Sequence, residues 1–276
     1  MCAQSTLHLR IRMQTDTNPA YPSTIHNLVV DWGNSSLKAG WFEGDTLVRT
    51  TRYDTPDVLL AELVNQSVAH VLVSSTSRPA DEIRRGFTGL QRNFMVLDSQ
   101  TALPIRKAYD TPHTLGADRV AAAVGAVALY PGQDCLVLDL GTCLTADLID
   151  HDAVFQGGLI SPGLRMRFRA MHEQTARLPL VEAPSAWPGL TAKNTQAAMQ
   201  SGVVNGLTFE LNGIIDAYRT ERPEIVVLLC GGDGPAFESR LKPPIFAVPN
   251  LVLIGLNRIL RYNVKNLQAN TPDNHT

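Results

Sequence analysis

The sequence predicts an α/β protein built from two similar halves. Each half opens with three apolar strand segments in a row, and strands then alternate with helices. Each opening strand ends in Asp-x-Gly followed by Asn or Thr, at Asp31 and again at Asp139. The length of 276 residues allows one large domain or two modest ones. We therefore expect an internal duplication, although the two halves share little sequence identity.

The first half shows the pattern of a strand meander followed by strand and helix alternation. Glu43-Gly44-Asp45 is a tight-turn signal that joins the second predicted strand to the third. Apolar runs and helical spacing predict strands at 28–31, 37–42, 46–51, 70–74 and 95–97, and helices at 58–65 and 80–87.

The second half repeats this order. Strands are predicted at 135–140, 144–150, 154–159 and 224–230, and helices at 164–174, 196–219 and 251–262. The segment Tyr130-Pro131-Gly132-Gln133 is a plausible boundary. The predicted domains are residues 25–133 and 134–262, with a flexible extension at 1–24 and a flexible tail at 263–276.

Composition excludes several classes of partner. The formal net charge of −2 gives no reason to expect binding to nucleic acid or to an anionic membrane. No apolar run approaches the length of a membrane span, and no signal peptide is evident. Cys2, Cys135, Cys143 and Cys230 form no Cys-x-x-Cys pair, which favours reduced thiols. We expect a cytoplasmic protein without a zinc site.

Two glycine-containing hairpins are candidates for binding phosphate. The segment 31–38 offers a turn at Gly33, two serine hydroxyls and the cation of Lys38, and Asp31 could hold Mg²⁺ through water. The segment 139–145 repeats this arrangement around Gly141 and Thr142. Either hairpin alone could be an ordinary β-turn, whereas two facing hairpins would grip a triphosphate from both sides. Residues 231–234, Gly-Gly-Asp-Gly, would let a nucleoside pack on backbone or would simply turn the chain.

The order of these motifs resembles the superfamily of actin, sugar kinases and heat-shock chaperones. The resemblance sharpens at 115–121, which reads Leu-Gly-Ala-Asp-Arg-Val-Ala, and the chain is similar to type III pantothenate kinases from about residue 25 to 260. Further agreement lies at 157–164, 175–181 and 202–206. The resemblance implies two ribonuclease H-like domains, the actin-like ATPase fold, around an ATP cleft. It also implies ATP-dependent phosphorylation of pantothenate, the first step of coenzyme A biosynthesis, by a homodimer.

The resemblance implies a role for each matching residue. Asp118 stands at the position of the general base, and Asp139 at that of a ligand for a monovalent cation, K⁺ or NH₄⁺. The ATP-binding positions are Asp31, Trp32, Gly33, Asn34, Ser35, Ser36, Leu37, Lys38 and Thr142. The pantothenate-binding positions are Tyr109, Gly116, Ala117, Asp118, Arg119 and Thr195, the last with Asn194 as a neighbouring alternative. Ser35 replaces the usual threonine, and Cys143-Leu144 replaces small or polar residues.

Some alternatives remain open. Asp118 begins the apolar helical pattern of Val120, Val124 and Val127, so spacing alone favours a simple helix cap. The surrounding Gly-Ala-Asp-Arg run favours the base. A regulatory, non-catalytic relative or another small-molecule kinase of the superfamily would explain the same hairpins.

The homodimer has one independent argument in the sequence. The helix predicted at 196–219 carries an apolar stripe wide enough to pack on more than its own domain. The stripe consists of Val203, Leu207, Leu211, Ile214 and Ile215.

Overall fold

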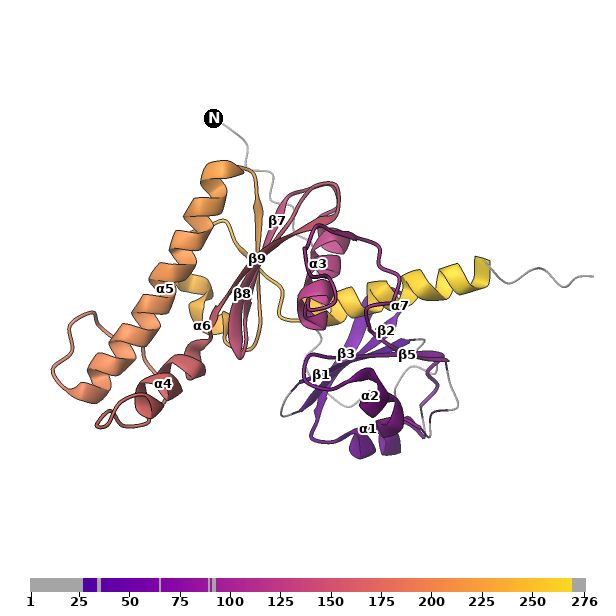
Figure 1. The fold of residues 1–276 in the computed structure, drawn as a ribbon, viewed down its shortest axis with the longest axis horizontal. Helices are drawn as coiled ribbons and strands as arrows, with labels where there is room; N and C mark the ends of the chain where they lie inside the picture. The colour runs from indigo at the N-terminus through magenta and orange to yellow at the C-terminus, as the bar shows by residue number, and fades with distance from the viewer. Residues whose placement is uncertain (1–26, 34–35, 65, 89, 91–92, 270–276) are drawn as a thin grey trace, which may run out of the picture.

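The structure is a computed structural model and describes residues 27–33, 36–64, 66–88, 90 and 93–269. Two β-sheets lie at the centres of two lobes, and two helices lie between them (Figure 1). The predicted extension at 1–24, Asn34 and Ser35, and the last seven residues of the predicted tail lie outside the described residues. Within the described part of the chain, no helix is both long enough and apolar enough to cross a membrane.

The first sheet has five strands in the order β3-β2-β1-β4-β5. The strands are β1 (Asn27–Trp32), β2 (Leu37–Glu43), β3 (Thr46–Tyr53), β4 (His70–Ser75) and β5 (Asn93–Val96). The first three are antiparallel, and β4 and β5 join parallel to β1 and β4. Gly44 closes the β2–β3 turn at φ +60°, a left-handed conformation that suits glycine.

The second sheet repeats this topology. Its order is β11-β10-β7-β8-β9-β6, so a meander again adds two parallel strands beside its first member. The strands are β7 (Cys135–Leu140), β8 (Cys143–Ile149), β9 (Val154–Pro162), β10 (Val226–Cys230) and β11 (Phe246–Ala247). A short strand, β6 (Arg106–Lys107), precedes β7 in the chain yet pairs with β9. The repeat confirms the predicted duplication.

Helices cover both faces of each sheet. The outer face of the first sheet packs on α1 (Pro56–Leu63) and α2 (Ala80–Gly86). The outer face of the second packs on α4 (Leu164–Glu173), α5 (Thr195–Glu221) and α6 (Gly234–Phe237). Between the sheets lie α3 (Ala117–Leu129) and α7 (Leu251–Ala269), whose apolar side chains share one core with both (Figure 1). A 3₁₀ turn, η1 (Glu238–Arg240), follows α6.

The two inner helices approach each other at glycines. A Cβ atom added at Gly255 would lie 1.7 Å from the carbonyl oxygen of Ala121, and one added at Gly125 would lie 2.6 Å from that of Leu251. Only glycine at both positions lets the backbones come this close. Since α7 also packs on β1, this crossing connects α3 to the first sheet through α7.

The sequence predicted every strand of four or more residues and six of the eight helical segments, with ends displaced by a few residues. One boundary was wrong: α7 runs to Ala269, whereas the sequence predicted its end near Tyr262 and a loose tail beyond. The reason is tertiary, because the Asn263 amide donates to the carbonyl of Ala102 at 2.9 Å and Val264 packs on the core. The segments β6, α6, η1 and β11 have two to four residues each, too few to show a period.

Candidate active site

Asp31 and Asp139 occupy equivalent places in the two sheets. Each is the last residue but one of the strand that opens its sheet. Their strand neighbours Val29 and Val137 both belong to the core around α3 and α7, so both carboxylates lie on the inner faces of the sheets. The fold therefore brings together two aspartates that lie far apart in the sequence.

Burial and mutual repulsion perturb both carboxylates. Burial, followed by the nearby charge of Asp118, raises the pKa of Asp31 to about 6. The same two causes, with a further contribution from Asp31, raise the pKa of Asp139 to about 7. The three carboxylates are thus close enough to interact. Such a group of incompletely neutralised carboxylates is suited to a bound cation.

Lys38 is the basic side chain paired with Asp31 in the sheet. It faces Asp31 directly across the β1–β2 ladder, and the two charges attract. Burial, and then the charge of Arg52, lower the pKa of Lys38. Its ammonium donates to the carbonyl of Pro249 at 3.0 Å, just before α7, and so links the first sheet to the C-terminal part of the chain.

The two predicted phosphate turns differ in length. The first spans residues 33–36, where the Gly33 amide donates to the Ser36 carbonyl at 3.0 Å. The second has two residues, Gly141 and Thr142, and the hydroxyl-bearing Thr142 is exposed. Trp32 and Leu37 point into the outer core of the first sheet. Any contact that they make with a nucleotide on the inner face would therefore come from their backbone.

The absence of a side chain at Gly231 leaves room for the Asp139 carboxylate. Gly231 follows β10 with φ at +85°, and a Cβ atom there would lie 2.4 Å from the Asp139 Oδ1 atom. The preceding Cys230 faces Asp139 across the β7–β10 ladder, and burial raises the pKa of its thiol well above the usual value. The sequence suggested that residues 231–234 support a nucleoside, and the structure adds that the first glycine makes room for a carboxylate.

Asp118 lies in the first turn of α3 without being its cap. The N-cap residue is Gly116, which makes no side-chain capping bond. The Asp118 carboxylate accepts a hydrogen bond from the amide of Arg119 at 2.8 Å. The simple helix-cap alternative is therefore wrong in its strict form, although the carboxylate does accept one amide of the first turn.

Arg119 is held by a carboxylate that the sequence reasoning missed. Its Nε atom lies 3.0 Å and 3.1 Å from the two oxygens of Asp147, and a terminal nitrogen makes a further contact. Both side chains are buried. The guanidinium carbon also lies 5.8 Å from the ring centre of Tyr109. A lone carboxylate in strand β8, which carries no other charged residue, was the signal that could have revealed Asp147.

Thr195 is not brought to these residues. It is the exposed first residue of α5, which packs on the outer face of the second sheet, whereas α3 lies against the inner face. The neighbouring alternative, Asn194, caps α5 by accepting the amide of Ala197 at 2.8 Å. Within one chain, Thr195 therefore lies apart from the inner carboxylates Asp31, Asp118 and Asp139.

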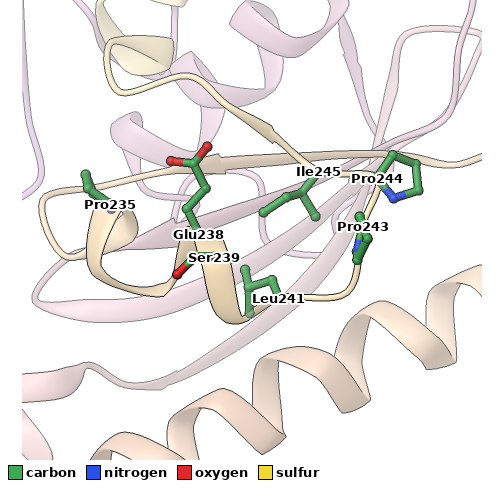
Figure 2. A pocket seen from close by; sticks show the side chains of 7 residues that line it. All are labelled: Pro235, Glu238, Ser239, Leu241, Pro243, Pro244 and Ile245. Atoms are coloured by element: carbon green, nitrogen blue, oxygen red, sulfur yellow. The ribbon is translucent and has the colours of Figure 1, made fainter. Parts of the chain in front are cut away.

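A surface pocket of about 500 Å³ lies elsewhere, on the segment from α6 to β11. Figure 2 shows that proline and aliphatic side chains supply most of its lining. None of the predicted site residues lines it, and Glu238 is its one charged side chain. We place the candidate site at the inner carboxylates, where perturbed pKa values and charged side chains converge.

Comparison with known proteins identifies one family. Residues 27–217 match the profile of a family described as type III pantothenate kinase. A protein of that name from Cytophaga hutchinsonii is 48% identical over 86% of this chain and all of its own length. A protein of the same name from Bacteroides fragilis is 41% identical over 86% of this chain and 98% of its own.

Solved structures support the fold. The activator of 2-hydroxyisocaproyl-CoA dehydratase from Clostridium difficile, with bound ADPNP, aligns with a TM-score of 0.52 at 12% identity over 91% of this chain and all of that one. A Campylobacter jejuni protein described as a Baf family transcriptional activator aligns with a TM-score of 0.56 at 21% identity over 86% of this chain and 99% of its own. These likenesses, with the repeated sheets, show the two-domain actin-like ATPase fold.

Proposed function

The chain belongs to the type III pantothenate kinase family, and we propose that Asp31, Asp118 and Asp139 carry its chemistry. The enzyme phosphorylates pantothenate with ATP to give 4′-phosphopantothenate, the first step of coenzyme A biosynthesis. The observation that supports the site is that Asp118 interacts with both strand-end aspartates. A purely regulatory protein would have no need to keep these three carboxylates together.

Asp118 acts as the general base in this proposal. The primary hydroxyl of pantothenate attacks the γ-phosphorus of ATP, its proton passes to the Asp118 carboxylate, and ADP leaves. Phosphoryl transfer has a loose transition state, so the base mainly orients the alcohol and accepts its proton late. Asp118 lies in the first turn of α3, where the positive end of the helix dipole attracts a carboxylate.

The acidic substrate is bound beside this base. Arg119 and Tyr109 lie next to each other, and the bond from Arg119 to Asp147 leaves other guanidinium N–H groups to donate. A guanidinium held in this way suits the carboxylate of pantothenate. Gly116 and Ala117 bring backbone to the same place at the start of α3.

ATP lies between the two turns in this proposal. Residues 31–38 and Thr142 supply backbone and side-chain donors, and Lys38 adds a positive charge. Mg²⁺ usually keeps several waters and binds through one or two carboxylates plus phosphates, which fits Asp31. A monovalent cation, K⁺ or NH₄⁺, fits the partly buried Asp139. When bound, these cations neutralise charge on the phosphates.

A homodimer accounts for Thr195. The apolar stripe that first suggested dimerisation is largely buried against the second sheet, so that argument fails. Other apolar side chains remain exposed nearby: Ile160 on β9, Met166 on α4 and Phe209 on α5. These segments are joined where Arg167 bonds Ser161 and Glu210. If Thr195 contacts pantothenate, a second copy must carry it to the site, because it lies on the far side of its own sheet.

An ADP-release assay tests the function directly. Purified protein is given ATP, Mg²⁺ and pantothenate in a buffer that contains either K⁺ or Na⁺ as the monovalent cation. The buffer is kept near neutral pH, because we propose that the protein works in the cytoplasm. We expect ADP release that requires pantothenate and rises with K⁺. Equal release without pantothenate would contradict the kinase assignment.

A second experiment tests the role of Asp31. Asp31→Asn should weaken Mg²⁺-dependent nucleotide binding, and a high Mg²⁺ concentration should partly restore that binding.

A further inference from the structure

Three charged side chains form a row across the first sheet. Arg52 on β3 lies directly opposite Lys38 on β2, and Lys38 lies directly opposite Asp31 on β1. Directly paired residues of antiparallel strands point to the same face. The neighbouring pair Tyr53 and Leu37 points into the outer core, so Arg52 and Lys38 lie on the inner face with the candidate site.

The pairing of Arg52 with Lys38 is unfavourable in the unliganded protein. Like charges directly opposite each other on adjacent strands repel and lower stability. The Asp31 carboxylate supplies one negative charge to the two cations in this row. An anion bound over the two cations would remove the repulsion.

Arg52 also lacks the structural contacts that Arg49, the other arginine of β3, makes. Arg49, on the same strand and the opposite face, binds Glu62 at 2.5 Å and lies 4.2 Å from the ring centre of Trp41. Arg52 is exposed, and among the described residues it forms no ion pair within 4.0 Å. One arginine of β3 thus braces helix α1, while the other presents its guanidinium to the inner face.

We propose that Arg52 is a further phosphate-binding residue of the ATP site and that it acts together with Lys38. The inference deepens the kinase function and rests on it. A guanidinium offers two parallel N–H donors that match two oxygens of one phosphate, which an ammonium cannot do. Arg52 would therefore favour nucleotides that carry β- and γ-phosphates, such as ATP, over AMP, which carries neither.

Arg52→Gln tests this inference, with Arg52→Lys as the conservative variant. Arg85→Gln is the matched control, since Arg85 is an exposed arginine of the same domain on α2 and loses the same charge. Calorimetry measures the binding of a non-hydrolysable ATP analogue and of AMP to each protein. Thermal unfolding without ligand reports the structural effect.

Arg52→Gln should weaken binding of the ATP analogue by about 5–30-fold, the range for one lost charge-assisted hydrogen bond or two. AMP binding should change by less than about 2-fold, since no bond to AMP is lost. The affinity of Arg52→Lys for the ATP analogue should lie between those of the wild type and of Arg52→Gln, because lysine keeps the positive charge and lacks the two parallel N–H donors. The melting temperature without ligand should be unchanged or higher, because a repulsion is removed.

Two results would overturn the inference. One is analogue binding by Arg52→Gln that equals that of Arg85→Gln. The other is an equal loss for AMP and the analogue together with a lower melting temperature, which indicates a structural role. Neither readout requires pantothenate, so a failure of the kinase assignment would appear separately, as wild-type protein that binds the analogue yet does not phosphorylate pantothenate.

Discussion

Asp147 anchors Arg119 through the Nε atom, which lies 3.0 Å and 3.1 Å from the two carboxylate oxygens. Both side chains are at least nine-tenths buried, so each charge depends on the other for compensation. Arg119 follows Asp118 directly in the sequence and lies beside Tyr109. The pair therefore ties the proposed base and the substrate-binding side chains to the second sheet.

Asp147→Asn should lower both stability and pantothenate affinity. The variant leaves the Arg119 charge buried without its partner, which costs about 3–5 kcal/mol of unfolding free energy. Denaturant unfolding measures this loss. Relative to the wild type, steady-state kinetics should show a larger increase in the KM for pantothenate than in the KM for ATP. Glu210→Gln is the control, because its partly exposed pair with Arg167 should be worth less than about 1 kcal/mol. An Asp147→Asn protein as stable as this control would contradict the anchoring role.

Asp118→Asn should abolish most turnover without affecting ATP binding. Asparagine keeps the shape and the hydrogen bond to the Arg119 amide, yet it cannot accept the proton. We expect kcat to fall about 10²–10⁴-fold, nearer the lower end because the transition state is loose. Asp57→Asn is the matched control, as Asp57 lies in the first turn of α1. A folded and fully active Asp118→Asn enzyme would falsify the assignment of the base.

Asp139 should make stability depend on pH and on K⁺. Its pKa is raised from 3.8 to about 7, so the folded protein holds this proton more tightly than the unfolded chain. The resulting stabilisation is present below about pH 4 and is lost as the pH rises through 7. Asp31, with a pKa near 6, adds a similar decline at lower pH.

Melting curves from pH 4 to 8 measure this effect. Without K⁺ the melting temperature should decline over this range more steeply in the wild type than in Asp139→Asn. K⁺ should oppose the decline at pH 8, where the carboxylate is ionised, and should have little effect at pH 4. An identical K⁺ response of the two proteins would contradict the proposal that Asp139 binds the monovalent cation.

Phe209→Glu should produce monomers. Phe209 is 61% exposed on α5, and a carboxylate there would be unfavourable in an apolar interface. Sedimentation at micromolar concentration should show dimers of the wild type and monomers of the variant. Val58→Glu is the control, because Val58 is similarly exposed, at 55%, on the first domain. A monomeric wild type would contradict the proposed homodimer.

Mixed dimers test whether Thr195 acts across the interface. Thr195→Ala should raise the KM for pantothenate by about 5–10-fold, the usual effect of one lost hydrogen bond. An excess of Asp118→Asn subunits should restore the low KM, because each supplies an intact Thr195 to a site with an intact Asp118. Subunits that carry both substitutions should give no rescue. Equal results with the single and double variants would place Thr195 outside the neighbouring site.

The fold was largely predictable because its strands and long helices are periodic. Both meanders, the alternation that follows and the tight turn at Gly44 were evident from local patterns. The proposed base Asp118 and the two strand-end aspartates were singled out through motifs in which glycine and carboxylate have fixed spacing. Asp147, Arg52 and the extension of α7 to Ala269 were not found, because their roles depend on partners distant in the sequence.

The sequence by itself determined the two repeated sheets, the strand ends that carry Asp31 and Asp139, and the family to which the chain is similar. Local hydrophobic period and turn chemistry are sufficient for this, since they act over a few residues. Only the tertiary structure decided which charges meet: Arg119 with Asp147, Arg52 with Lys38, and Asp118 with both strand-end aspartates. It also decided that Thr195 lies apart, because packing α3 and α5 on opposite faces of one sheet separates residues that both resemble substrate-binding positions.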